Sequence, residues 1–270
     1  MESVGVAMHL AGQSGRAAKI FQQAIAENPG TDRTAAYYFY LAGACEMSGN
    51  TDEALQAARQ SAALRPDSLS FQVRAAWILY HAKRYEQAEE EYLKFLKQHD
   101  AEYDSSATRE ALREARLTLS NICVLRHRLP EAEEWLEQIL DEFPENVSAL
   151  NDLGYLWADQ DRHLHRALAM VSRAVEAEPD NAAYRDSLGW AYYRLGRYPE
   201  AVRELEEAAH GEKPDGVILD HLGDAYLQAR LPDKAVSAWR RAAEVFRGRQ
   251  ETDNLTKTEA KIRKHGAGLP

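Results

Sequence analysis

The sequence predicts an all-α fold in which helix pairs stack into a solenoid, and three observations support this. The 270 residues include 44 alanines but only 11 valines and 7 isoleucines, and alanine favours helices whereas β-branched residues favour strands. Hydrophobic residues make up 45% of the chain, an ordinary share for a folded protein. Short motifs recur at intervals of 34 or 35 residues, which indicates helical units that bury their apolar faces by stacking.

The first helix of five expected units carries a leucine followed by a small residue. From Leu119 onward, successive leucines are 34, 35 and 34 residues apart. In the last three units the small residue is glycine, which allows a second helix to approach closely. The leucines are Leu41, Leu119, Leu153, Leu188 and Leu222.

The second helix of each unit carries an alanine that follows the leucine position by 13 or 14 residues. A small side chain here serves the same close contact from the other helix. A proline then ends the second helix at Pro29, Pro66, Pro144 and Pro179, because proline cannot continue the hydrogen-bond ladder. The alanines are Ala54, Ala88, Ala132, Ala167, Ala201 and Ala235.

These motifs resemble the tetratricopeptide repeat, a 34-residue helix–turn–helix unit. The best match, DSLGWAYYRLGRYPEAVRELEEAA, spans residues 186–209. The resemblance covers nearly the whole chain and implies a right-handed α-solenoid. Residues 149–197 also look like a segment of bacterial tetratricopeptide lipoproteins and periplasmic adaptors, some of which deliver substrates to processing proteases. This narrower similarity favours a bacterial source and an envelope location.

The repeat register divides the chain into seven units and an end segment. Residues 103–112 are an insertion expected to extend either a loop or the start of the next helix. The first unit lacks the first residues of its first helix, which indicates either a chain cut from a longer precursor or a divergent short repeat. The units are 1–31, 35–68, 69–102, 113–146, 147–181, 182–215 and 216–249, and residues 250–270 form a capping helix and tail.

The resemblance implies that first-helix residues line a concave groove that receives a partner segment. Aromatic residues would supply rigid contact area there. In the N-terminal half the expected groove residues are Phe39, Tyr40, Arg74, Trp77, Tyr80 and His81. In the C-terminal half they are Asn151, Asp152, Tyr155, Asp159, Asp186, Trp190, Tyr193, Arg194, Asp220, His221 and Asp224.

The charge of the C-terminal half of this groove favours a basic and apolar partner segment. Five aspartates there face one arginine, Arg194, and carboxylates accept hydrogen bonds from Lys or Arg. Family members of the carboxylate-clamp type hold a C-terminal carboxylate with Lys, Arg and Asn at such positions. The aspartates and aromatic residues found here argue against that type.

The sequence gives no sign of catalysis or of a cofactor. It contains no nucleophile elbow, phosphate-binding loop, zinc-protease motif or dinucleotide-binding glycine pattern. The cluster Asp159, Asp161, His163 and His165 could hold a divalent metal, but polar residues are ordinary in a loop between helices. Cys45 and Cys123 are expected two units apart, too far for a disulfide, as small buried residues.

The predicted function is therefore a non-enzymatic scaffold or adaptor that binds a protein or peptide in its groove. The net charge of −10 argues against nucleic acid as a partner. A regulatory or targeting segment of a longer protein, which could include an enzyme, and a self-assembling repeat protein are the alternatives. The oligomeric state stays open. The location is expected to be cytoplasmic if the chain is complete and periplasmic if a leader was trimmed. The sequence contains no run of 18 apolar residues, so it predicts no transmembrane helix.

Overall fold

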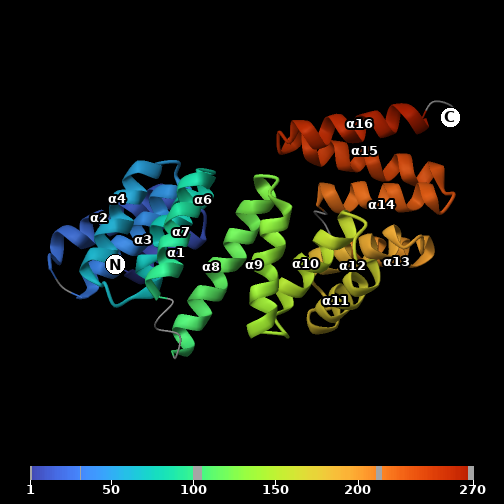
Figure 1. Ribbon diagram of the computed structural model, residues 1–270. Coiled ribbons are helices and arrows are strands. Elements are labelled where there is room, and N and C mark those ends of the chain that lie inside the picture. Colours follow the sequence, from blue (N-terminus) through green and yellow to red (C-terminus); the bar gives the residue numbers. More distant parts are fainter. Residues whose placement is uncertain (1, 31, 100–104, 211–214, 267–270) are drawn as a thin grey trace. The chain divides into compact units, whose positions relative to one another are not determined.

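The computed structural model describes residues 2–30, 32–99, 105–210 and 215–266, and all regular structure in these ranges is helical. This confirms the all-α prediction (Figure 1). The chain divides into two compact units, residues 1–135 and 136–270, each with its own interior. In the described residues, every helix is too short or too polar to cross a bilayer.

The first unit, residues 1–135, is built from successive antiparallel helix pairs. The first helix of the third pair is divided into α5 and α6 by a single residue, Val73, whose φ and ψ stay in the right-handed helical region. The helices are α1 (Glu2–Leu10), α2 (Ser14–Glu27), α3 (Asp32–Met47), α4 (Thr51–Leu64), α5 (Leu69–Gln72), α6 (Arg74–His81), α7 (Tyr85–His99), α8 (Ser106–Leu125) and the first half of α9 (Leu129–Glu142).

Two expectations about this unit can be compared with its helices. The described part of the 103–112 insertion lengthens the next helix, since α8 begins at Ser106 after the Ser105 side chain caps it. Residues 103 and 104 lie outside the described residues. The first helix of the first repeat, expected to be short, is the nine-residue α1.

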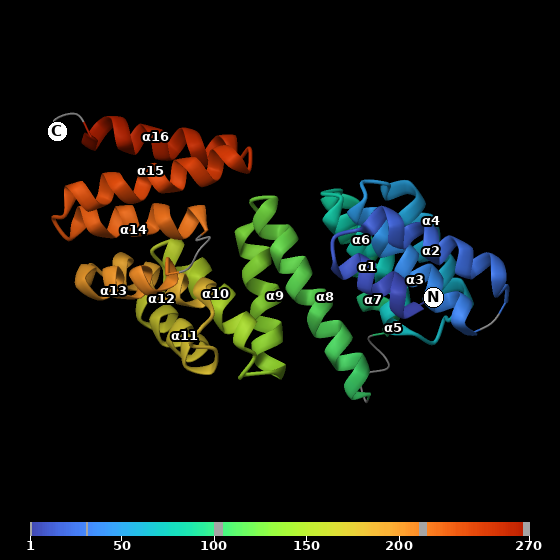
Figure 2. The same ribbon diagram turned by 180° about the vertical axis from the view of Figure 1, so that it is seen from behind.

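The second unit, residues 136–270, continues the pattern with more regular pairs. Figures 1 and 2 show α14, α15 and α16 lying side by side at its C-terminal end. Its helices after α9 are α10 (Val147–Asp159), α11 (Leu164–Ala177), α12 (Ala182–Arg194), α13 (Tyr198–Ala208), α14 (Gly216–Gln228), α15 (Pro232–Gly248) and α16 (Thr252–Gly266).

The first helices of these pairs start at repeated side-chain caps. Asn146, Asn181 and Asp215 each precede such a helix, and each accepts a hydrogen bond from a backbone N–H of the first turn. An acceptor at this position satisfies a donor that the helix itself leaves unpaired. The cap therefore fixes where each repeat begins.

The small residues of the repeat lie where the two helices of a pair touch. All six motif alanines, from Ala54 to Ala235, are fully buried. A Cβ added to Gly154 would lie 2.7 Å from Val171 Cγ1, one on Gly189 2.6 Å from Leu205 Cγ, and one on Gly223 2.4 Å from Trp239 Cδ1. This confirms the close helix approach that the sequence predicted.

The two cysteines are confirmed as buried, free thiols. Burial is the largest cause that raises the pKa of Cys45, to about 12. The pKa of Cys123 is raised by burial as well. Both side chains are therefore protonated at neutral pH and act as small apolar residues.

Candidate functional site

The first unit contains an open groove of about 690 Å³ whose walls come from four parts of the repeat array. The α3 wall contributes Phe39, the divided helix α5–α6 contributes Leu69 and Trp77, and α7 contributes Tyr92. The α8 wall consists mainly of small and acidic residues: Ala107, Glu110, Ala111, Glu114 and Ala115. Its size and apolar walls are typical of a ligand site.

Arg74 lies in this groove between two aromatic rings. Its Cζ atom is 4.2 Å from the centroid of the Phe39 ring and 4.2 Å from that of the Trp77 ring. Phe39 in turn stacks on Phe71, with ring centroids 5.0 Å apart. The guanidinium therefore contacts two aromatic rings, an arrangement that stabilises a cation.

Arg74 makes no hydrogen bond or ion pair with the part of the chain that the structure describes, and its Nε is buried without a partner. Burial lowers the pKa of Arg74 to about 10, so the side chain is still charged at pH 7. Burial also raises the pKa of Tyr92 to about 12, so that hydroxyl is neutral. Arg74 is thus a cation in a largely apolar setting.

The carboxylates at the groove edge already have cationic partners. Arg65 Nε lies 3.0 Å from Asp67 Oδ1, and Arg113 Nη2 lies 2.7 Å from Glu114 Oε1. Arg113 also pairs with Glu110. Each acidic group thus has an arginine neighbour on its own segment, with Glu110 and Glu114 sharing Arg113, whereas Arg74 has no carboxylate partner among the described residues.

Three of the expected N-terminal groove residues, Phe39, Arg74 and Trp77, line this groove together. Tyr40 instead stacks on Phe21, with centroids 5.5 Å apart. Tyr80 and His81 are not among the residues that line the groove; the His81 ring lies against Trp77, with centroids 4.0 Å apart, and against Tyr80, with centroids 5.4 Å apart. The α8 wall was not predicted, because Ala107, Glu110 and Ala111 belong to the insertion and no residue of the wall is one of the motif leucines or alanines.

Several of the expected C-terminal groove residues are buried inside the second unit. Trp190 is 7% exposed, stacks on His221 with centroids 4.1 Å apart and donates from Nε1 to Asp159 Oδ1 at 3.2 Å. Tyr193 stacks on the Trp190 ring. His221 Nδ1 lies 2.9 Å from Asp186 Oδ1, and both residues are buried.

The aspartates that were expected to attract a basic segment are largely paired within the unit. Lys261 of α16 donates to Asp220 Oδ2 at 2.6 Å and to Asp224 Oδ2 at 2.7 Å. The buried Thr258 hydroxyl also donates to Asp220, at 2.8 Å. The capping helix therefore supplies the basic group that the sequence assigned to a partner.

Other residues expected in the C-terminal half of the groove have polar groups that are hydrogen-bonded or buried. Arg194 Nε donates to Asp161 Oδ1 at 2.8 Å. Asp152 accepts from the buried Asn151, and burial raises the pKa of its carboxyl. Burial likewise raises the pKa of the Tyr155 hydroxyl. Among the described residues, Asp152 and Asp159 of this set accept hydrogen bonds from neutral side chains, Asn151 and Trp190.

Residues of the loop cluster that was considered as a metal site make other contacts. Asp161 pairs with Arg194, and His163 packs against Trp157 with ring centroids 5.0 Å apart. Another trio, Glu89, Cys123 and Glu131, does converge, with ligand atoms within 4.8 Å. Its two carboxylates form ion pairs with arginines.

Arg126 Nη1 lies 2.5 Å from Glu89 Oε2, and Arg128 Nη2 lies 2.6 Å from Glu89 Oε1. Arg128 Nη1 also lies 2.8 Å from Glu131 Oε2. These pairs account for the converging acidic groups as an ion network between neighbouring repeats.

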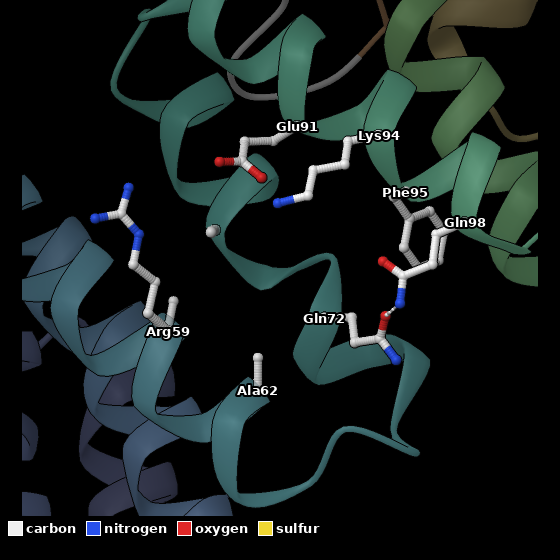
Figure 3. A pocket seen from close by; sticks show the side chains of 9 residues that line it. Arg59, Ala62, Gln72, Glu91, Lys94, Phe95 and Gln98 are labelled. Carbon is white, nitrogen blue, oxygen red and sulfur yellow. Dashed lines mark hydrogen bonds between the residues drawn. The ribbon is translucent and has the colours of Figure 1, made fainter.

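A second hollow, of about 330 Å³, lies between α4 and α7. Figure 3 shows Arg59 reaching it from one side, Glu91 and Lys94 from another, and Gln98 bonded to Gln72 at its lower edge. Its charged side chains are partly or fully exposed. The groove around Arg74 is larger and better enclosed by aromatic residues.

Comparison with known proteins places both halves of the chain in one family. A family model described as tetratricopeptide repeat matches residues 5–123, and a second with the same description matches residues 161–217. The TPR repeat-containing protein PA4667 of Pseudomonas aeruginosa is 30% identical over 178 residues, or 66% of this chain. The aligned part spans only 28% of that protein.

Solved structures show the same fold at low sequence identity. A tetratricopeptide repeat protein from Parabacteroides merdae is similar over 95% of this chain and 96% of its own, with a TM-score of 0.67 and 14% identity. A chain of the APC/C hetero-tetramer Cut9–Hcn1 is similar over 94% of this chain and 48% of its own, with a TM-score of 0.68 and 16% identity.

Proposed function

The chain belongs to the tetratricopeptide repeat family, and we propose that it is a scaffold that binds a segment of a partner protein in the groove around Arg74. The fold itself suggests a role in protein–protein interaction, and such repeat proteins are generally not enzymes. The choice of this groove is the proposal. One similar structure is a chain of the APC/C hetero-tetramer Cut9–Hcn1, which is in keeping with a partner-binding role.

The open, aromatic-lined groove is the observation that carries this proposal. Phe39 and Trp77 present rings to a space of about 690 Å³, and rigid aromatic side chains dominate binding energy in many interfaces. The equivalent C-terminal positions instead hold buried contacts, such as Trp190 with His221. A partner segment would therefore find its main apolar contacts in the first unit.

The proposal is tested by removing the two rings together. Peptides are selected from a displayed random library on the purified chain, and their affinities are measured for the wild type and for Phe39→Ala with Trp77→Ala. We expect a loss of at least tenfold, because loss of aromatic anchors typically costs about 2 kcal/mol or more. Melting curves of the double variant check that it stays folded.

A matched control removes apolar surface from the same unit outside the groove. Leu93 and Leu125 are 42% and 49% exposed and do not line it. Leu93→Ala with Leu125→Ala is expected to leave peptide affinity unchanged. Equal losses in both double variants would contradict the groove assignment.

Self-association is a second candidate, favoured by exposed apolar side chains near the first helices. Leu10 is 81% exposed and Met47 61% exposed, and such surface can pack between chains. Light scattering over a range of concentrations separates the two roles, because a mass that stays at one chain excludes self-assembly.

A further inference from the structure

The Arg74 guanidinium is a charged group that lines an open groove and has no counter-charge among the described residues. Four charged side chains line the groove. Asp67, Glu110 and Glu114 each pair with an arginine. Arg74 pairs with no carboxylate among the described residues. An unpaired, partly buried charge is costly for the folded chain. A group that is kept at such a cost, and that faces an open groove, suggests an incoming counter-charge.

We propose that Arg74 selects partner segments by binding a carboxylate, so that the groove takes an acidic residue beside an apolar one. This inference rests on the proposed function and adds the chemistry of the ligand. It differs from the expectation of a basic segment, which relied on aspartates of the second unit.

The geometry around Arg74 restricts how a ligand can approach. The rings of Phe39 and Trp77 both lie against the guanidinium, each centroid lying 4.2 Å from Cζ. Its Nε is buried without a partner, and the side chain is one of those that line the open groove. A carboxylate that enters the groove can accept two parallel hydrogen bonds from a guanidinium, which is the strongest pairing available to arginine.

The surroundings strengthen that pairing relative to a surface ion pair. Leu69, Val73 and Ala111 line the groove next to Arg74, and charge pairs interact more strongly where water is excluded. The same apolar walls accept an aliphatic or aromatic ligand side chain adjacent to the acidic one. A basic ligand side chain next to Arg74 is disfavoured, because the guanidinium repels it.

We assign the carboxylate to an Asp or Glu side chain of the partner segment, because the groove residues argue against a clamp for a C-terminal carboxylate, and two libraries test this assignment against the end of a chain. One displays random peptides within a loop and the other displays them with free C-termini. Both are selected on the wild type, on Arg74→Met and on Arg74→Lys. We expect the wild type to enrich acidic residues at one position and Arg74→Met not to do so, with Arg74→Lys between them. Enrichment in the loop library would show that the carboxylate belongs to a side chain.

Binding constants of synthetic peptides then give the magnitude. For an acetylated and amidated selected peptide, Glu→Gln is expected to weaken wild-type binding by roughly tenfold to a hundredfold, in line with a lost charge-assisted pair. The same change should have under threefold effect on Arg74→Met, and an intermediate effect on Arg74→Lys, which keeps the charge but lacks the planar fork.

The results distinguish failure of this inference from failure of the proposed function. Peptides that lose affinity with Phe39→Ala and Trp77→Ala but show no acidic preference would keep the groove and overturn the carboxylate. Equal Glu→Gln effects in the wild type and Arg74→Met would overturn it too. Selected peptides that are insensitive to the two aromatic substitutions would overturn the proposed function itself.

Discussion

At the scale of single residues, the fold depends on a few positions where two helices leave no room for a side chain. Gly189 is one of them, since a Cβ there would lie 2.6 Å from Leu205 Cγ and 3.3 Å from the Ala201 carbonyl oxygen. Leu205 is itself fully buried and cannot move aside freely. The repeat therefore needs glycine for space rather than for backbone freedom.

Gly189→Ala is expected to destabilise the chain by about 1–3 kcal/mol. Alanine gains up to about 1 kcal/mol in helix propensity, but overpacking a filled interior costs more. Gly248 is the matched control, because a Cβ added there meets nothing within 4 Å. Urea unfolding should show a lower midpoint for Gly189→Ala and an equal or higher one for Gly248→Ala. Two equal shifts would argue against the steric account.

At the scale of elements, α16 is attached to α14 by a buried polar contact and not only by apolar packing. Lys261 bonds Asp220 and Asp224, and its side chain and theirs are 29%, 19% and 18% exposed. Burial raises the pKa of Asp224, and the Lys261 ammonium opposes that rise. The contact thus makes two nearby carboxylates tolerable in the folded state.

Lys261→Met is expected to destabilise the chain by about 3–5 kcal/mol at pH 7.5, the cost of leaving buried charges unpaired. Without the ammonium the folded-state pKa of Asp224 rises further above its unfolded value. A raised carboxyl pKa lowers stability once pH exceeds the unfolded value, so the penalty should shrink as pH falls and Asp224 becomes protonated.

Denaturant titrations at several pH values measure this, with Lys257→Met as the control. Lys257 lies on the same helix, is exposed and has no ion pair among the described residues. Its substitution should have little effect at any pH. A Lys261→Met penalty that does not change with pH would contradict the role assigned to Asp224.

At the scale of the whole molecule, stability is spread over neighbouring helix pairs. Residues 1–135 and 136–270 each have a compact interior, and within each unit helices contact mainly their neighbours in sequence. Repeat arrays of this kind behave as chains of nearest-neighbour interactions. A local defect should therefore loosen nearby repeats first.

Leu205→Ala tests this by hydrogen exchange. Leu205 is fully buried among residues of α13 to α15, and such a truncation costs about 2–5 kcal/mol. Amides of α12 to α15 are expected to exchange faster, with α2 to α4 little changed. A uniform rise along the chain would instead indicate that it unfolds as one cooperative unit.

The repeat architecture follows from sequence because each of its signals is local. Helix pairing follows from positions such as Leu188 and Ala201, and helix starts follow from caps such as Asn181, all within one 35-residue unit. The candidate site was only partly predictable. Phe39, Arg74 and Trp77, which the repeat register grouped together, line one groove in the structure, but nothing in the sequence showed that Trp190 would be covered.

The sequence by itself determined the all-α repeat, the close helix contacts and the set of residues on the first helices. Tertiary structure decided which of those residues have partners. Lys261 pairs with Asp220 and Asp224 from 41 and 37 residues away, whereas Arg74 meets two rings and, in the part of the chain that the structure describes, no carboxylate. Charge compensation depends on distances between side chains of different helices, and those distances exist only once the repeats have stacked.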